Sequence, residues 1–179
     1  ASPFILKSNP CNPTGVTWTG HALEALVKFC SAEGQGGIID EAYEFFHYPD
    51  PVSAMQYVRN IDKTNLFVIG AATKGLQVPG MRTGWAIASR ANIEIFRNYS
   101  SLGMGGVSRA SQLFVSKLLD LQRVSQSRIA VSKFFEAQRN KYRQAFTDLG
   151  MELHTGDGGF YHWGKLPGSL SAREFNERL

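Results

Sequence analysis

Two kinds of apolar pattern alternate along most of the chain. Short runs of consecutive apolar residues, such as PFILKS at 3–8 and NLFVIGA at 65–71, are typical of strands that are buried on both faces. Between these runs, apolar residues recur at three- and four-residue intervals, which is typical of amphipathic helices. The alternation predicts an α/β fold in which helices cover a mainly parallel sheet. The predicted strands are residues 3–8, 36–40, 65–71 and 83–89.

Helices are predicted between and after these strands. Thr19 is a candidate N-cap for the first helix, because its hydroxyl oxygen can accept a hydrogen bond from the first turn. The helices predicted in this part of the chain are residues 19–33, a short helix within 51–61, and residues 91–100 and 107–122.

The pattern changes near residue 125. An apolar stripe at helical spacing predicts one long helix over 126–149, and Gly150 is a typical helix stop. Residues 152–167 then predict one or two strands of a separate layer, followed by a helix at the end of the chain. We therefore predict that residues 1–125 are part of a larger α/β domain, and that residues 126–179 are part of a smaller α+β domain entered through the long helix.

Charge and hydropathy exclude two classes of partner. The net charge is +4, and Lys and Arg are scattered along the 179 residues. The densest basic cluster is RNKYR at 139–143, which we assign to the solvated face of the long helix. This distribution argues against a nucleic-acid partner. There is neither an apolar run of membrane-spanning length nor a signal-peptide pattern, so we expect no membrane association.

The cysteines and histidines indicate no metal chemistry. Cys11 and Cys30 are the two cysteines of the sequence, and they form neither a CxxC motif nor a metal-ligand spacing with histidine. We therefore expect a reduced, cytoplasmic protein. His47 and His162 lie among aromatic residues and are predicted to pack or to face solvent. The chain begins without Met and opens directly into a strand, so we expect it to be a piece of a longer protein.

Polar residues with constrained neighbours follow the predicted strands. Asn12 lies in a loop with two Asn-Pro pairs, Asp40 ends the second strand, and Lys74 follows the third. Tyr43 comes three residues after Asp40, and Arg82 comes eight residues after Lys74. In an open α/β sheet, ligands bind at the carboxyl ends of the strands. Each residue alone is an ordinary surface residue, but together they predict one ligand site.

These five residue types suit a phosphorylated pyridine ring that also carries an aldehyde and a phenolic oxygen. A lysine can form an imine with the aldehyde and can carry protons once it is released. A carboxylate beside the ring nitrogen keeps that nitrogen protonated, so that the ring accepts electrons from a carbanion. An amide and a phenol can donate to the phenolic oxygen, and an arginine can bind the phosphate through two hydrogen bonds.

The motifs that hold these residues resemble a known family. NPCNPTG at 9–15, DEAY at 40–43 and TKGLQVPGMRTGW at 73–85 are similar, in order and spacing, to elements of the pyridoxal-phosphate-dependent class I/II aminotransferases. These enzymes belong to fold type I, the aspartate aminotransferase superfamily. GGFYHW at 158–163 also resembles the small-domain strand of the family. The resemblance extends over essentially the whole chain, and it implies the pyridoxal-phosphate-binding large domain followed by part of the small domain.

The resemblance implies a role for each residue and the cofactor pyridoxal 5'-phosphate. Lys74 would be the Schiff-base lysine, and Asp40 the partner of the ring nitrogen. Tyr43 and Asn12 would contact the phenolic oxygen, and Arg82 the phosphate. The family usually has Ser or Thr three positions before the lysine, where this chain has Ala71, so Thr73 is the candidate substitute. The amino-terminal part of the family and its carboxyl-terminal substrate-binding arginine lie outside this sequence.

The resemblance also implies an activity and an assembly. We expect an aminotransferase that moves an amino group between an amino acid and a 2-oxo acid, working as a homodimer. Two alternatives stay open at this point. One is related chemistry with the same residues, such as C–S β-elimination. The other is a non-catalytic, aminotransferase-like sensor domain of a transcription regulator.

Overall fold

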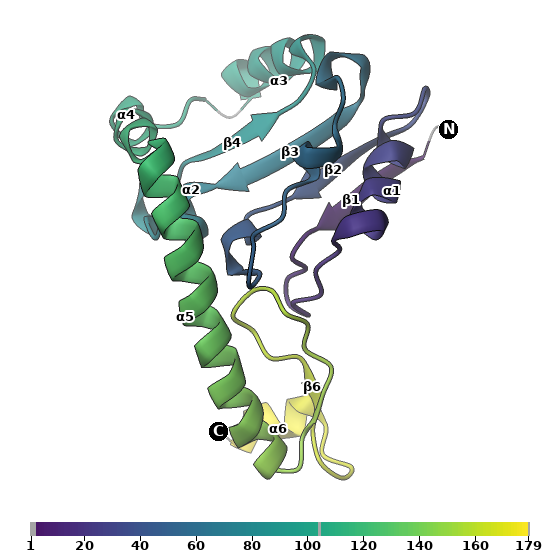
Figure 1. Ribbon diagram of the computed structural model, residues 1–179, viewed down its shortest axis with the longest axis vertical. Helices are drawn as coiled ribbons and strands as arrows, with labels where there is room; N and C mark the ends of the chain where they lie inside the picture. Colours follow the sequence, from purple (N-terminus) through teal and green to yellow (C-terminus); the bar gives the residue numbers. More distant parts are fainter. Residues whose placement is uncertain (1–2, 104, 179) are drawn as a thin grey trace.

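The larger sheet of the computed structural model, which describes residues 3–103 and 105–178, has four strands (Figure 1). Their order across the sheet is β1-β2-β3-β4. The first three strands run parallel and the fourth pairs antiparallel with the third. This confirms the prediction of a mainly parallel sheet. The strands are β1 (Phe4–Ser8), β2 (Gly36–Asp40), β3 (Leu66–Ala71) and β4 (Gly84–Ile87).

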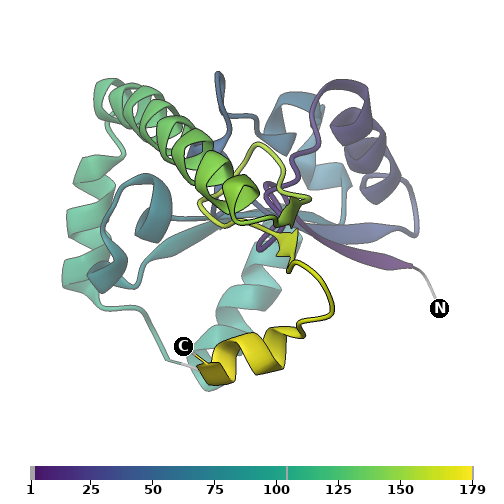
Figure 2. The same ribbon diagram turned by 90° about the horizontal axis from the view of Figure 1, so that it is seen from below.

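Helices cover both faces of this sheet. Leu66 and Val68 of β3 pack into a buried cluster with helix α1 (Gly20–Cys30). Phe67 lies between them in sequence, so it points to the other face, where its ring centroid is 6.2 Å from that of Phe96 in helix α3 (Arg90–Gly103). Figure 2 shows α1 and α3 on opposite sides of the sheet. The predicted α/β fold class is confirmed.

The edge strand β1 is less covered than its apolar sequence predicts. Ile5 packs against the cluster around α1, whereas Phe4 and Leu6 on the other face are 57% and 72% exposed. Helix α3 reaches β3 on that second face but leaves β1 open. The prediction that every strand is buried on both faces is therefore wrong for β1, and Ile39 in the central strand β2 is 1% exposed.

The helices after the sheet break at a different residue from the one predicted. Helix α4 (Arg109–Leu118) ends before Asp120, and helix α5 (Leu121–Asp148) begins immediately after it. The Asp120 carboxylate accepts hydrogen bonds from the backbone N–H groups of Gln122 and Arg123, at 3.0 and 3.2 Å. This N-cap starts the long helix earlier than residue 126 and corrects the predicted helix 107–122.

Several short helical turns replace longer predicted elements or appear where none was predicted. The predicted short helix within 51–61 consists of one 3₁₀ turn and the beginning of another. The four-residue helix α2 directly follows β3. The short turns are η1 (Glu44–Phe46), η2 (Ala54–Tyr57), η3 (Ile61–Lys63), α2 (Ala72–Gly75) and η4 (Pro79–Met81).

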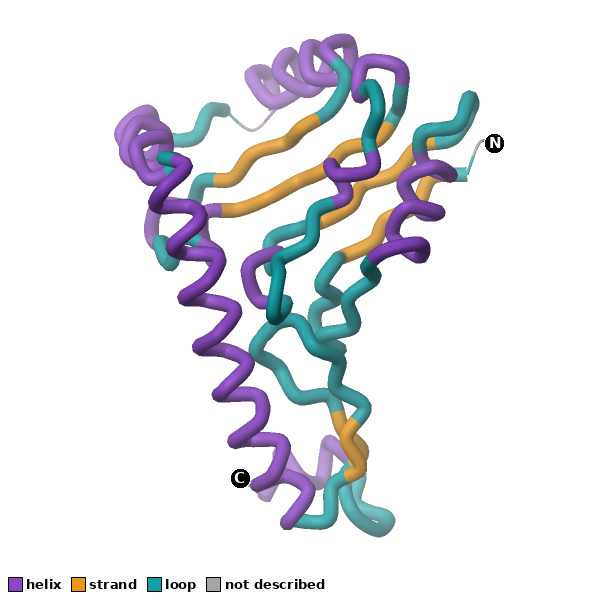
Figure 3. Tube along the Cα trace, viewed as in Figure 1, coloured by secondary structure: helices purple, strands orange, loops and turns teal. Residues whose placement is uncertain are grey.

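The end of the chain forms a second, smaller layer beside α5. Strands β5 (Glu152–Leu153) and β6 (Gly164–Lys165) pair antiparallel, and α6 (Ala172–Arg178) follows them. Figure 3 shows that loops make up most of this part. The domain division near residue 125 stays a prediction. In the described part of the chain, no helix has the length and apolarity needed to cross a membrane.

Two buried clusters stabilise the fold. The aliphatic cluster lies between α1, the sheet and η2, and it contains Leu23, Leu26, Val27, Cys30, Ile39, Ala54, Leu66 and Val68. The aromatic cluster joins η1 and α2 to α4, α5 and the turn before β6. It contains Tyr43, Phe45, Phe46, Ala72, Leu76, Val115 and Val131, with Phe135, Phe160 and Tyr161 packed against it.

Candidate active site

Asp40 and Lys74 are placed by the carboxyl ends of two neighbouring strands. Asp40 is the last residue of β2 and pairs in register with Ile69 of β3. Its Oδ1 accepts a hydrogen bond of 2.9 Å from the backbone N–H of Ala42, which fixes the carboxylate at the strand end. Lys74 lies in α2, which begins where β3 ends. The sequence prediction that strand ends bring these residues to one edge of the sheet is confirmed for this pair.

The Lys74 amine lies over aromatic rings. Its Nζ is 5.6 Å from the ring centroid of Tyr43 and 5.1 Å from that of Phe160. These are distances at which an ammonium group is attracted to the face of a ring. The residue after Lys74 must be small, because a Cβ at Gly75 would lie 2.8 Å from the Phe45 ring. The glycine lets α2 pack closely on η1, and this contact holds the lysine beside Tyr43.

The Tyr43 hydroxyl has a partner that the sequence reasoning missed. Tyr43 is 7% exposed, and its hydroxyl oxygen is 3.2 Å from that of Tyr161. Burial raises the pKa of Tyr43, and Tyr161 and the charge of Asp40 raise it further. The phenol therefore keeps its proton and stays a hydrogen-bond donor. The resemblance of GGFYHW at 158–163 to a strand is wrong for these residues, because β6 begins at Gly164 and the motif forms the turn before it. The motif also gave no signal that Tyr161 would reach Tyr43.

The loop between β1 and α1 is fixed by Asn9 and not by Asn12. The Asn9 side chain is fully buried, donates to the carbonyl of Trp18 at 3.0 Å, and accepts from the N–H of Trp18 at 2.7 Å. Asn12 is exposed at the tip of the loop. The two Asn-Pro pairs of this loop therefore differ, although both have the same sequence. The Asn9 side chain of the first pair holds the loop in place, and the Asn12 amide of the second pair projects from it.

The same loop is hydrogen-bonded to the turn before β6. The backbone N–H of Gly156 donates to the carbonyl of Thr14, and that of Gly158 donates to the carbonyl of Gly15, both at 2.8 Å. His47 and Asp157 add an ion pair of 3.3 Å between η1 and this turn. The segment that carries Phe160 and Tyr161 is thus attached to the ends of both β1 and β2.

Thr73 and Arg82, the two residues predicted to bind the phosphate, make few contacts. Thr73 is half-buried in α2, next to Ala71 at the end of β3. Arg82 is exposed, and its Nη1 donates to the carbonyl of Pro79 at 3.1 Å. Arg82 and Gln77 have φ of +50° and +56°, which costs a non-glycine residue roughly 1–2 kcal/mol. Such strain is typical of functional segments. The structure gives neither Arg82 nor Asn12 a direct contact with Tyr43 or Lys74.

Arg139 corrects the interpretation of the basic cluster at 139–143. It is 1% exposed, so it does not lie on the solvated face of α5. Its Nη1 donates to the carbonyls of Phe46 and Gly159, at 3.0 and 2.8 Å, and its Nη2 binds Glu136 Oε2 at 2.8 Å. One guanidinium therefore holds η1, the turn at 159 and α5 together behind Tyr43.

Glu41 is a second carboxylate at this edge, and it points away from the candidate site. It is buried, accepts from the Ser53 hydroxyl at 2.7 Å, and also accepts from the N–H of Ala54. Burial raises the pKa of Glu41 to about 7, against the lowering effect of these hydrogen bonds. Glu41 thus fixes the segment after β2 to η2, and Asp40 is the carboxylate beside Tyr43 and Lys74.

Comparison with known proteins decides which family this arrangement belongs to. A family model described as "Aminotransferase class I and II" matches residues 1–179. The chain belongs to the class I and II aminotransferases. The cofactor of this family is pyridoxal 5'-phosphate. The resemblance inferred from the motifs at 9–15, 40–43 and 73–85 is therefore confirmed at the level of the family and its cofactor.

Curated relatives of the chain differ in their named activities. It is 28% identical over 172 residues to 1-aminocyclopropane-1-carboxylate synthase 7 of Arabidopsis thaliana, across 90% of the chain. It is 24% identical over 145 residues to an L-aspartate:5-guanidino-3-methyl-2-oxopentanoate transaminase of Pseudomonas syringae pv. syringae, across 78% of the chain. The chain spans 38% of the length of each of these relatives.

Solved structures show the same fold. An aminotransferase from Staphylococcus aureus matches with a TM-score of 0.84 and 20% identity, over 98% of this chain and 46% of that one. An aromatic aminotransferase from Pyrococcus horikoshii matches with a TM-score of 0.83 and 22% identity, over 97% and 47%. At these identities the likeness establishes the fold-type-I architecture of the aminotransferase chain.

Proposed function

We propose that this chain carries the cofactor site of an enzyme that transfers an amino group between an amino acid and a 2-oxo acid. The observation that carries the proposal is the convergence of Asp40, Tyr43 and Lys74 at the ends of β2 and β3. A buried phenol, an amine and a carboxylate meet there on one side of the sheet.

The side chains present fit pyridoxal phosphate. When bound, this cofactor supplies a ring that accepts the electrons released at the substrate Cα. The amine of Lys74 can hold its aldehyde carbon, the carboxylate of Asp40 suits a protonated ring nitrogen, and the hydroxyl of Tyr43 suits a phenolic oxygen. The family match supports the same assignment.

Each residue then has a defined task. Lys74 Nζ would hold the cofactor aldehyde carbon and, when it is free, would move a proton at the substrate Cα. The Asp40 carboxylate would keep the ring nitrogen protonated. The Tyr43 hydroxyl would donate a hydrogen bond to the phenolic oxygen, and the Tyr161 hydroxyl, 3.2 Å away, would orient it.

The remaining contacts are made by more exposed residues. Asn12, which projects from the loop clamped by Asn9, would donate a hydrogen bond from its amide to the phenolic oxygen. Arg82 would bind the phosphate, with Thr73 in the place of the serine or threonine that is absent at Ala71. The strained backbone at Arg82 supports a functional role for this segment.

A second candidate activity is favoured by the curated relatives. One of those most similar to the chain is named as an aminocyclopropane-carboxylate synthase, and another as a transaminase. Both activities require the amine of Lys74 and the carboxylate of Asp40. Incubation with an amino acid and 2-oxo acids separates them, because transfer gives a new amino acid from the 2-oxo acid. Formation of 1-aminocyclopropane-1-carboxylate without transfer would assign the second activity.

The assembly and the compartment are part of the proposal. We expect the protein that carries this chain to be a cytoplasmic homodimer with its sites at the subunit interface. Cys11 and Cys30 are both free thiols, which supports a reducing compartment. Sedimentation of the active protein measures its assembly directly.

The experiment that tests the site uses Lys74. The protein carrying this chain should show a visible absorption band with pyridoxal phosphate, and borohydride should attach the cofactor permanently to Lys74. Lys74→Ala should abolish the adduct and lower the rate by on the order of 10²–10⁴, because the proton carrier is lost.

The matched control is Lys117→Ala, which removes an exposed lysine of α4. This variant should keep the band and the rate. A peptide map that places the reduced adduct on a lysine other than Lys74 would overturn the assignment of the site.

A further inference from the structure

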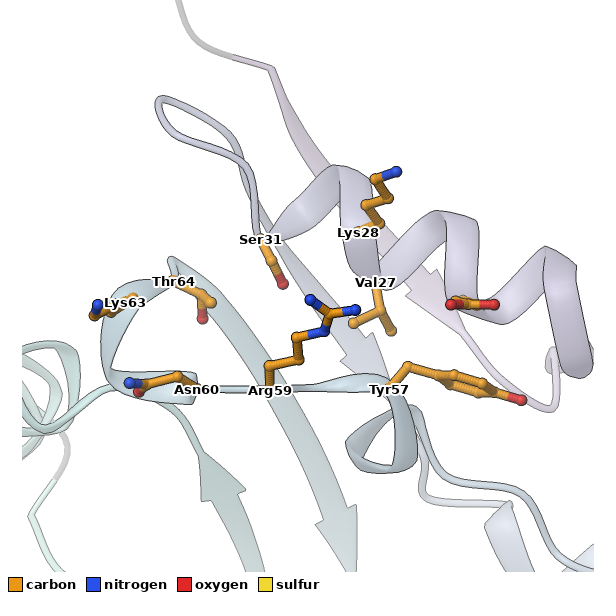
Figure 4. Close-up of a pocket in the computed structure, with 9 residues that line it drawn as sticks. Val27, Lys28, Ser31, Tyr57, Arg59, Asn60, Lys63 and Thr64 are labelled. Atoms are coloured by element: carbon orange, nitrogen blue, oxygen red, sulfur yellow. The ribbon is translucent and has the colours of Figure 1, made fainter.

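A pocket of about 490 Å³ is lined by residues of α1 and of the segment that precedes β3 (Figure 4). One wall is the outer side of α1 with the residue after it, from Glu24 to Ser31, and the other wall is the segment from Tyr57 to Thr64. Ser31 precedes β2 and Thr64 precedes β3, so the pocket lies toward the amino ends of these strands. It shares no residue with the candidate active site, and it does not depend on the function proposed above.

Positive charge dominates the lining of this pocket. Lys28, Arg59 and Lys63 line it together with a single carboxylate, that of Glu24. Among the residues that the structure describes, none of these three cations has a carboxylate within 4.0 Å. The neighbouring carboxylate of Asp62 contacts Arg90 instead, at 3.5 Å. The wall from Tyr57 to Thr64 therefore carries an excess of positive charge, whereas Glu24 balances Lys28 on the α1 wall.

A buried hydroxyl in the same pocket lacks a partner. Ser31 Oγ is shielded from solvent and makes no hydrogen bond within the described chain. Leaving such a group unpaired costs about 1–3 kcal/mol. Figure 4 shows the Arg59 side chain extending from its backbone toward the end of α1, with the Ser31 hydroxyl and the Arg59 guanidinium pointing toward one another. Both groups can donate, and a turn of the Ser31 side chain about its Cα–Cβ bond would bring the hydroxyl to an acceptor that binds Arg59.

The size of the pocket limits the acceptor. Its volume falls in the range of roughly 300–1,000 Å³ that is typical of sites for small molecules. Half-buried Tyr57 adds apolar surface next to the charges. We propose that this pocket binds a small phosphate ester. Arg59, Lys28 and Ser31 bind the phosphate oxygens, and the organic part lies against Tyr57.

Calorimetric titration of the chain with phenyl phosphate tests this proposal. Phenyl phosphate should bind saturably and more tightly than inorganic phosphate, because only the ester fills the apolar side. Arg59→Gln should weaken binding by roughly ten- to a hundredfold, the cost of a charged hydrogen bond. Ser31→Ala should weaken it less, and added salt should weaken it in the unchanged chain.

Two controls separate this pocket from the candidate active site and from general charge attraction. Lys117→Gln removes an exposed charge on α4, and this variant should bind phenyl phosphate as the unchanged chain does. The second control is the location of the binding. In NMR spectra, the amide shifts on binding should lie in residues 24–31 and 57–64.

Three outcomes would overturn the proposal. The first is the absence of saturable binding of phenyl phosphate. The second is equal weakening by Lys117→Gln, or amide shifts that lie around Lys74 and Arg82 instead, which would mean general attraction or binding elsewhere. The third is tighter binding of succinate than of phenyl phosphate, which would identify a dicarboxylate site.

Discussion

The aliphatic and aromatic clusters differ in how far apart along the chain their residues lie. The aliphatic cluster is built from residues 23–68, in which helix, strand and turn follow one another. The aromatic cluster joins Tyr43 to Tyr161 and Phe46 to Arg139, pairs that are 118 and 93 residues apart. The first is a local α/β core, and the second connects two distant segments of the chain.

This difference bears directly on the candidate active site. Lys74 and Tyr43 lie on the aromatic cluster, where Phe160 and Tyr161 arrive from the far end of the chain. Asp40 ends a strand whose interior packs on the aliphatic cluster. The sheet therefore sets the position of the carboxylate, whereas long-range packing sets the surroundings of the amine and the phenol.

The largest expected effect comes from removing a buried side chain of either cluster. Phe46→Ala should lower the free energy of unfolding by about 3–5 kcal/mol, and Leu66→Ala by about 2–5 kcal/mol, as measured by urea unfolding. Phe46 contacts the Tyr43 ring at a centroid distance of 5.4 Å, so only the first change should shift the NMR signals of that ring strongly.

If the alanine variant does not fold, Phe46→Leu can replace it in this measurement, because leucine keeps most of the buried volume. It should still shift the Tyr43 signals more than Leu66→Ala does. Equal shifts in the two variants would mean that the clusters form a single cooperative core.

A smaller effect is expected from the pair of hydroxyl groups. Tyr161→Phe should lower the free energy of unfolding by about 1 kcal/mol, because the Tyr43 hydroxyl loses its partner. A double-mutant cycle with Tyr43→Phe should give a coupling energy of about 0.5–1.5 kcal/mol. The control is Tyr142→Phe on the half-exposed side of α5, which should show no coupling. A coupling near zero would remove Tyr161 as the group that orients Tyr43.

The smallest effect concerns the ion pair between His47 and Asp157. The hydrogen bond to Asp157 raises the pKa of His47 above its usual 6.5, against burial, which lowers it. Burial opposes ionisation of Asp157, but bonds from His47 and Thr17 outweigh it and lower its pKa below the usual 3.8. The ion pair therefore stabilises the fold fully between the usual pKa values of 3.8 and 6.5. This stabilisation is lost as pH rises through the raised pKa of His47.

Asp157→Asn should accordingly cost about 0.5 kcal/mol near pH 6 and less near pH 9, as measured by urea unfolding across pH. Glu33→Gln changes an exposed carboxylate and should cost the same at both pH values. A cost for Asp157→Asn that grows with pH would contradict the assigned pair.

Local pattern was sufficient for the sheet and for the positions of Asp40 and Lys74. Uninterrupted apolar runs predict central strands, and residues that follow such strands must lie at one edge. The pattern could not distinguish Asn9 from Asn12, because both precede proline and their burial depends on the fold around them. It also missed the Asp120 cap, which lies within a predicted helix that the structure divides.

Long-range contacts account for the other errors. The sequence RNKYR looks like a solvated helix face, and only the approach of Phe46 and Gly159 makes the burial of Arg139 favourable. Likewise, nothing beside Tyr161 in the sequence indicates that its hydroxyl meets Tyr43. Such residues are set by tertiary contacts, which no window of neighbouring residues contains.

The two carbonyls that bind Arg139 also limit how the length of α5 can change. The helix begins at a fixed cap, Asp120. The Arg139 guanidinium must point toward the carbonyls of Phe46 and Gly159 to donate to both. One residue inserted between the cap and Arg139 would turn the side chain by about 100° and advance it by about 1.5 Å. The number of residues between Asp120 and Arg139 is therefore fixed. This stretch of helix tolerates substitutions on its outer side but not single insertions or deletions.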